Sequence, residues 1–153
     1  MYTRSDIEVF DNKGNLVLVV DTKNKLGTNS EWAAIMRQNM MVHGLLPSAP
    51  FFLLALPDRF YLWKSRQLSE LEKPDYEIDT AAILKTYSER IGADLQSLSG
   101  ASFELLLISW LRDLIRQTKL TDTILAHGTN DWLVESGLLE AIKEGIVVSE
   151  GVR

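Results

Sequence analysis

Three charged residues near the start of the chain, Asp6, Asp21 and Lys23, have the types and the spacing of a metal-assisted acid–base site. If the two carboxylates face each other, their repulsion is unfavourable unless something neutralises it, and a divalent cation would do so. Mg²⁺ prefers one or two carboxylates, a carbonyl oxygen and several waters, and the Thr22 carbonyl would be a third protein ligand. Lys23 would then be free to act on a water or a phosphate. The chain contains no cysteine, which favours a hard ion, Mg²⁺ or Mn²⁺.

The elements that would position these residues form a predicted β-hairpin. Residues 4–10 and 16–23 have strand character, and the polar segment 11–15 contains the turn signal Lys13-Gly14. A tight turn there sets an antiparallel register in which Asp6 faces Asp21 and Glu8 faces Val19. Because side chains alternate along a strand, Lys23 lies on the same face as Asp21. In the simpler alternative, Asp6 caps an edge strand while Asp21 and Lys23 form a solvated charge pair.

Length and composition limit the classes of protein. The 153 residues, 46 % hydrophobic and 24 % charged, predict one soluble domain, with residues 1–64 as its core and residues 65–153 as a mainly helical elaboration. No apolar run is long enough to span a membrane, so we expect a cytoplasmic protein. The net charge of -5 predicts weak affinity for nucleic acid from this chain alone. Basic residues could still form a local positive rim, or they could simply be scattered over a solvated surface; they are Lys13, Lys23, Lys25 and Arg37 near the hairpin, and Arg59, Lys64 and Arg66.

The rest of the chain alternates between predicted strands and helices. Segment 30–44 has helical periodicity, an Asn29 or Ser30 cap and a glycine stop, and it carries Gln38 beside the inner, Met-rich stripe. Runs at 51–56 and 59–64 predict two further strands, and 65–79 is a charged connector. Helices are predicted at 81–91, 103–116 and 130–144, with an edge strand possible at 146–148. The helix at 103–116 is apolar over so wide a face that it must pack across the sheet or against a partner subunit.

The order of the first elements resembles the PD-(D/E)xK nuclease superfamily, which has the restriction-endonuclease-like fold. The similarity covers roughly residues 4–64 and includes Ser-Asp-Ile-Glu-Val-Phe-Asp, the glycine turn, Leu-Val-Leu-Val-Val-Asp-Thr-Lys and the following helix. The resemblance implies an α/β (α+β) fold with a mixed sheet of about four to five strands flanked by helices. It also implies Mg²⁺ (or Mn²⁺) ligation by Asp6 and Asp21, activation of water by Lys23, and substrate contacts from Gln38 and Lys25.

This chain departs from the family pattern in that Ser5 replaces the signature proline, and only five residues precede Asp6 where the family core begins with a helix. A later helix or another subunit is therefore expected in that place. Two functions are expected from the sequence. One is metal-dependent hydrolysis of phosphodiester bonds in DNA. The other is a catalytically weak or inactive nuclease-like scaffold that acts as an interaction subunit in a defence or mobile-element system, as a homodimer or within a larger assembly.

Overall fold

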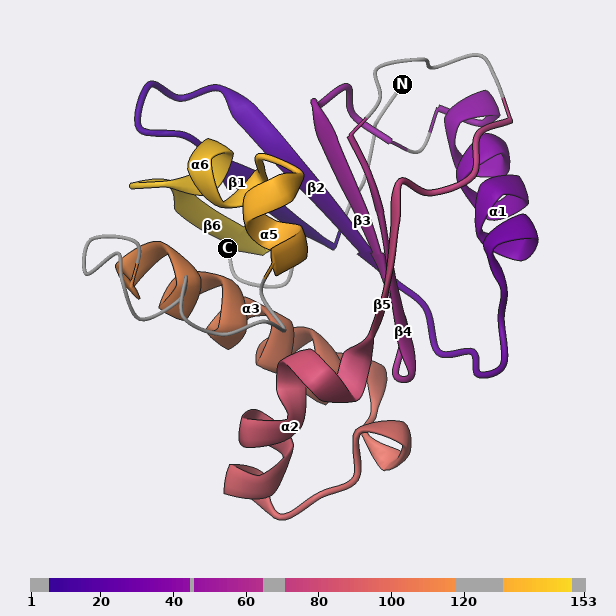
Figure 1. Ribbon diagram of the computed structural model, residues 1–153, viewed down its shortest axis with the longest axis vertical. Helices are drawn as coiled ribbons and strands as arrows, with labels where there is room; N and C mark the ends of the chain where they lie inside the picture. Colours follow the sequence, from indigo (N-terminus) through magenta and orange to yellow (C-terminus); the bar gives the residue numbers. More distant parts are fainter. Residues whose placement is uncertain (1–5, 45, 65–70, 118–130, 150–153) are drawn as a thin grey trace.

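The fold is described from a computed structural model, which covers residues 6–44, 46–64, 71–117 and 131–149 (Figure 1). It is a mixed α+β fold, in which one six-stranded sheet has the strand order β5-β4-β3-β2-β1-β6 and is flanked by helices. The elements are β1 (Ile7–Phe10), β2 (Leu16–Thr22), α1 (Ser30–Val42), β3 (Phe51–Ala55), β4 (Arg59–Trp63), β5 (Tyr76–Asp79), α2 (Thr80–Ile91), the 3-10 helix η1 (Leu95–Ser97), α3 (Gly100–Gln117), α5 (Asp131–Glu135), α6 (Leu138–Ile142) and β6 (Ile146–Ser149).

The predicted hairpin forms with the predicted register. β1 and β2 pair antiparallel, with Ile7 opposite Val20 and Glu8 opposite Val19. The turn is closed by Asp11, whose carboxylate accepts hydrogen bonds from the backbone N–H groups of Lys13 and Asn15, both at 2.9 Å. One difference is a register shift between Val9 and Phe10. It places one extra residue in β2, at the end of the hairpin next to the turn. The opposite end, where Asp6 and Asp21 lie, keeps the regular alternation.

One face of the sheet is covered by α1 alone among the described helices (Figure 1). Ala33 and Met40 of α1 are buried against a cluster that includes Val19, Leu54 and Trp63. Of the two caps that the sequence allowed, Asn29 is the one used: its side chain accepts a hydrogen bond from the Trp32 N–H at 2.8 Å. Since Val19 and Asp21 are two residues apart on β2, Asp21 belongs to the same face as α1.

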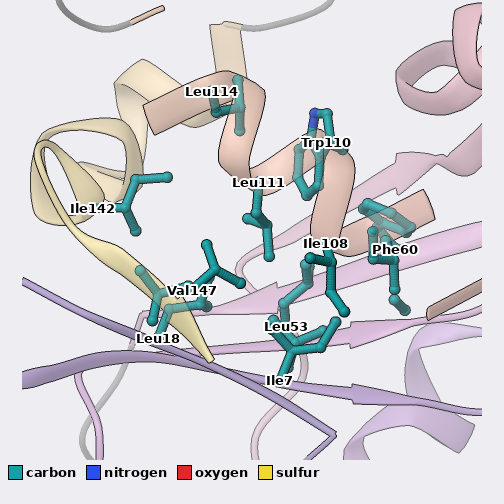
Figure 2. Packing of buried hydrophobic residues seen from close by; sticks show 14 of the residues in the cluster. Ile7, Leu18, Leu53, Phe60, Ile108, Trp110, Leu111, Leu114, Ile142 and Val147 are labelled. Atoms are coloured by element: carbon teal, nitrogen blue, oxygen red, sulfur yellow. The ribbon is translucent and has the colours of Figure 1, made fainter. Parts of the chain in front are cut away.

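The other face carries α3, with α5 and α6 beside it and α2 at one end (Figure 1). Leu111 and Ile108 of α3 point towards Ile7 and Leu53 of the sheet (Figure 2). Trp110 lies with its ring centroid 5.6 Å from that of Phe60, and Leu107 and Leu111 are completely buried. The wide apolar surface of α3 is therefore explained by packing within this chain.

Several expectations for the second half of the chain were wrong in detail. The sheet has six strands rather than four to five, because Tyr76–Asp79, assigned to a connector, pairs with β4. The expected helix at 130–144 is two short helices separated at Gly137, whose φ of 85° ends the first. The possible strand at 146–148 is confirmed as β6, which pairs with β1. Within the described residues, no helix is both long and apolar enough to cross a membrane.

Candidate active site

Asp21 is the buried centre of the candidate site. It is the next-to-last residue of β2, only 7 % of its surface is exposed, and its cross-strand neighbour on β3 is Leu54. On the other side, Asp6 immediately precedes β1, whose register pairs Ile7 with Val20, and its carboxylate interacts with that of Asp21. Lys23 is the neighbour that stabilises the Asp21 carboxylate on this apolar face, whereas the neighbouring Asp6 disfavours its charged form.

Asp6 is fixed in place by Thr22. The backbone N–H and the Oγ1 hydroxyl of Thr22 both donate to Asp6 Oδ2, at 2.7 and 2.9 Å. The sequence predicted a role for the Thr22 carbonyl as a metal ligand, and that role stays a prediction. The structure gives Thr22 a different contact, since its two donors orient the carboxylate of Asp6.

Lys23 completes the cluster. Its Nζ lies 3.1 Å from Asp21 Oδ2, and 37 % of its side chain is exposed. Thr22 and Lys23 also line a cavity of about 100 Å³, together with Asn24, Pro57 and Phe103. The ammonium group therefore contacts a buried carboxylate while its residue borders a hollow near the start of α3.

The environment raises the pKa of Asp21 to about 6 from its ordinary value of 3.8. Burial is the largest cause, because it disfavours the charged carboxylate, and the neighbouring Asp6 acts in the same direction. Lys23 opposes the rise by stabilising the charged form. Asp21 thus changes its charge near pH 6, and a cation bound beside it would favour the ionised form.

The donor set fits a hard divalent cation. Asp21 Oδ2 is buried and, apart from its ion pair with Lys23, has no hydrogen bond within the described residues. Mg²⁺ is commonly bound by one or two carboxylates, and Asp6 and Asp21 supply two, one of which has an oxygen without a hydrogen bond among the described residues. Water and substrate would fill the other coordination positions of the cation. Within the described residues, no group of three or more His, Cys, Asp or Glu side chains is placed to hold a metal.

The two predicted substrate-contacting residues lie apart from this cluster. Lys25 is exposed, and its Nζ lies 5.8 Å from the centroid of the Trp32 ring. Gln38 is half-buried on α1, and its Oε1 is buried without a hydrogen-bond partner among the described residues. Within the described residues, neither side chain belongs to the hydrogen-bonded and ion-paired cluster around Asp6 and Asp21, so their roles stay predictions.

Arg37 was expected on the surface, either in a local basic rim or simply solvated, and this was wrong. Arg37 is only 2 % exposed. Its guanidinium carbon lies 5.4 Å from the centroid of the Trp63 ring, and Nη1 lies 3.6 Å from Glu72 Oε1. The signal was present in the sequence, because Arg37 is four residues after Ala33 and three before Met40, on the inner face of the helix.

No protein-family model, curated protein or solved structure matches this chain.

Proposed function

We propose that this protein hydrolyses phosphodiester bonds in DNA with a divalent cation, Mg²⁺ or Mn²⁺, held by Asp6 and Asp21. The observation that carries the proposal is the grouping of a buried carboxylate, a second carboxylate and a lysine at one end of the β1–β2 hairpin. A structural ion pair needs one acid, whereas the second acid adds repulsion that a bound cation would relieve.

Each residue then has a defined task. Asp6 and Asp21 hold the cation, and Thr22 keeps the Asp6 carboxylate oriented through its two hydrogen bonds. The bound cation would polarise the phosphate and lower the pKa of its water. Lys23 donates from Nζ to the attacking water or to a phosphate oxygen, where negative charge develops. The exposed part of its side chain gives it access to a substrate.

A cleavage assay tests the proposal directly. Fluorescent single- and double-stranded DNA is incubated with the protein and Mg²⁺, Mn²⁺ or EDTA, alongside the variants Lys23→Ala and Lys13→Ala. Lys13 is a matched control, because it is exposed in the hairpin turn. We expect metal-dependent cleavage that falls at least about 100-fold in Lys23→Ala and is unchanged in Lys13→Ala.

Calorimetric titration with Mn²⁺ separates binding from chemistry. We expect binding to the native protein and none to Asp21→Ala. Cleavage that persists equally in Lys23→Ala would indicate a contaminating nuclease, and the proposal would then be abandoned.

The second candidate function is an interaction subunit built on a nuclease-like scaffold. It is favoured by edge strand β6, which leaves Ile146 63 % exposed and Val148 39 % exposed. This candidate predicts neither Mn²⁺ binding nor cleavage, together with association in sedimentation experiments that Ile146→Lys weakens.

A further inference from the structure

The ammonium group of Lys23 lies where a cation bound to Asp21 would have to lie. Nζ is 3.1 Å from Asp21 Oδ2, and this buried oxygen has no hydrogen bond within the described residues. The charge of the ammonium group is thus what neutralises Oδ2, which is also the oxygen best suited to bind a divalent cation. Lys23 and a cation therefore compete for the same atom.

The distances show that both positive charges cannot stay beside this oxygen without strong repulsion. Mg²⁺ lies about 2.1 Å from a carboxylate oxygen that binds it. With Nζ 3.1 Å from the same oxygen, the two positive charges would be at most about 5 Å apart. Asp21 is only 7 % exposed, so water screens this repulsion weakly. The favourable response is for the ammonium group to move away when a cation is bound.

A space for the ammonium group lies next to Asp21. Thr22, Lys23 and Asn24 line the cavity of about 100 Å³ that adjoins the start of α3. One water molecule needs about 10–15 Å³ of cavity volume, so this cavity can hold an ammonium group together with several waters. The amide oxygen of Asn24 can accept a hydrogen bond there. Movement into the cavity would therefore leave the ammonium group solvated.

Only the side chain of Lys23 has to move. Its backbone N–H donates to the Ala55 carbonyl at 3.1 Å, which anchors the residue just after the end of β2. The side chain is 37 % exposed, whereas that of Asp21 is 10 % exposed. A lysine side chain is a flexible four-carbon stem, so its ammonium group can change position while the backbone stays in place.

We infer that Lys23 is a latch: its ammonium group holds Asp21 in the metal-free protein, and it turns into the neighbouring cavity when a cation binds to Asp21. This inference rests on the proposed function, and it adds regulation of the same site. Lys23 is then available to a substrate only after the cation has bound. The latch also weakens cation binding, because the ion pair must be broken first.

Calorimetric titration with Mn²⁺ tests the competition. Lys23→Met keeps an unbranched side chain but removes the charge, so Mn²⁺ should bind about tenfold more tightly than to the native protein. Lys25→Met is the matched control, because it removes the same charge from an exposed residue whose Nζ lies over the Trp32 ring. We expect its affinity for Mn²⁺ to stay within about twofold of the native value.

A measurement on the native protein detects the movement. Phe103 lines the cavity, so nuclear Overhauser contacts between the Lys23 Hε protons and the Phe103 ring should strengthen when diamagnetic Mg²⁺ saturates the site. The Lys23 signals are identified by their absence from Lys23→Met. If that variant proves unfolded by circular dichroism, Lys23→Arg identifies them instead, and the contacts in the native protein decide. Contacts that do not change with Mg²⁺ would overturn the inference.

The outcomes distinguish this inference from the proposed function. Tighter Mn²⁺ binding by Lys23→Met, together with no DNA cleavage by the native protein, supports the latch and refutes hydrolysis. DNA cleavage by the native protein, together with equal or weaker Mn²⁺ binding by Lys23→Met, supports hydrolysis and overturns the latch. Equal tightening in Lys23→Met and Lys25→Met also overturns it, because the effect would then come from net charge rather than from the contact with Asp21.

Discussion

Thr22 donates two hydrogen bonds to one oxygen of Asp6, from its backbone N–H at 2.7 Å and from Oγ1 at 2.9 Å. The residue between Asp21 and Lys23 in the sequence therefore fixes the carboxylate on the opposite strand. Such an arrangement restricts Asp6 before any ligand binds, and it makes the side chain of Thr22 part of the site.

Thr22→Val tests this relationship, because valine has the shape of threonine without the hydroxyl. The hydrogen bond from Oγ1 is lost while the one from the backbone N–H remains. We expect the free energy of unfolding to fall by about 1–2 kcal/mol in urea titrations. Mn²⁺ affinity measured by calorimetry should fall about 10-fold or more, since residues that orient metal ligands have effects of about 10–100-fold. Thr22→Ser should restore both properties, and unchanged affinity in Thr22→Val would contradict the orienting role.

The raised pKa of Asp21 predicts how stability depends on pH. Between the unfolded value of 3.8 and the folded value of about 6, the folded protein binds more protons than the unfolded chain, so stability falls as pH rises through this range. The raised pKa lowers the free energy of unfolding by about 3 kcal/mol above pH 6, and it has no effect on stability below about pH 4. Without metal, Asp21→Asn should therefore be more stable than the native protein at pH 8, and nearly equal to it at pH 4, in thermal unfolding followed by circular dichroism.

Asp11 provides the control for this prediction, because its pKa is shifted in the opposite direction. Hydrogen bonds from the Asn15 backbone and other turn groups lower the pKa of Asp11. Its contribution to stability is present above the unfolded pKa and is lost as pH falls through the folded value. Asp11→Asn should accordingly lose stability at pH 8, where Asp21→Asn gains it. Loss of stability in both variants at pH 8 would show that Asp21 is not destabilised by its surroundings.

Packing of α3 on the sheet gives a third prediction. Leu111 is completely buried against the sheet, whereas Leu105 on the same helix is 59 % exposed. Leu111→Ala leaves a cavity and should lower the free energy of unfolding by about 2–5 kcal/mol. Leu105→Ala should change it by about 0.5 kcal/mol or less in the same urea titration. Similar losses in both variants would mean that α3 buries its other face as well.

Gly145 gives a fourth prediction, because backbone atoms lie close to it on two sides. A Cβ added there would lie 2.5 Å from the carbonyl oxygen of Phe10 and 2.8 Å from that of Ile142. Gly145→Ala should therefore cost about 1–3 kcal/mol, since neither backbone can easily move. The control is Gly100→Ala at the start of α3, where a Cβ meets nothing within 4 Å. If the melting temperature fell equally in both variants, the close approach of backbone to Gly145 would be contradicted.

The first half of the fold could be predicted because its signals are local. The turn at Lys13-Gly14 sets the register that brings Asp6 to Asp21, and the Asn29 cap and the periodicity of 30–42 define α1. Strand β5 was missed because Tyr76–Asp79 has only four residues and follows a charged segment that contains Pro74, although its apolar–polar alternation is typical of a half-buried strand. Its pairing with β4 cannot be predicted from the residues of this segment alone, because it depends on the position of β4 in the folded sheet.

The details of the site depend on contacts that are distant in sequence. Arg37 was placed on the surface because an isolated arginine on a helix is usually solvated, and its burial depends on Trp63 and Glu72, which lie far along the chain. The predicted grouping of Asp6, Asp21 and Lys23 required only strand alternation and register. The pairing of Thr22 with Asp6 required knowing which way the threonine hydroxyl points.

The pairing of β1 with β6 has a consequence for biosynthesis. The outer edge of β1 is closed by Ile146–Ser149, the last strand described along the chain. Until the ribosome has synthesised the residues between the hairpin and β6, the outer edge of β1 has unpaired backbone groups. Such an edge readily pairs with strands of other chains. The newly made hairpin is therefore exposed to aggregation until Ile146–Ser149 has been synthesised and has paired with β1.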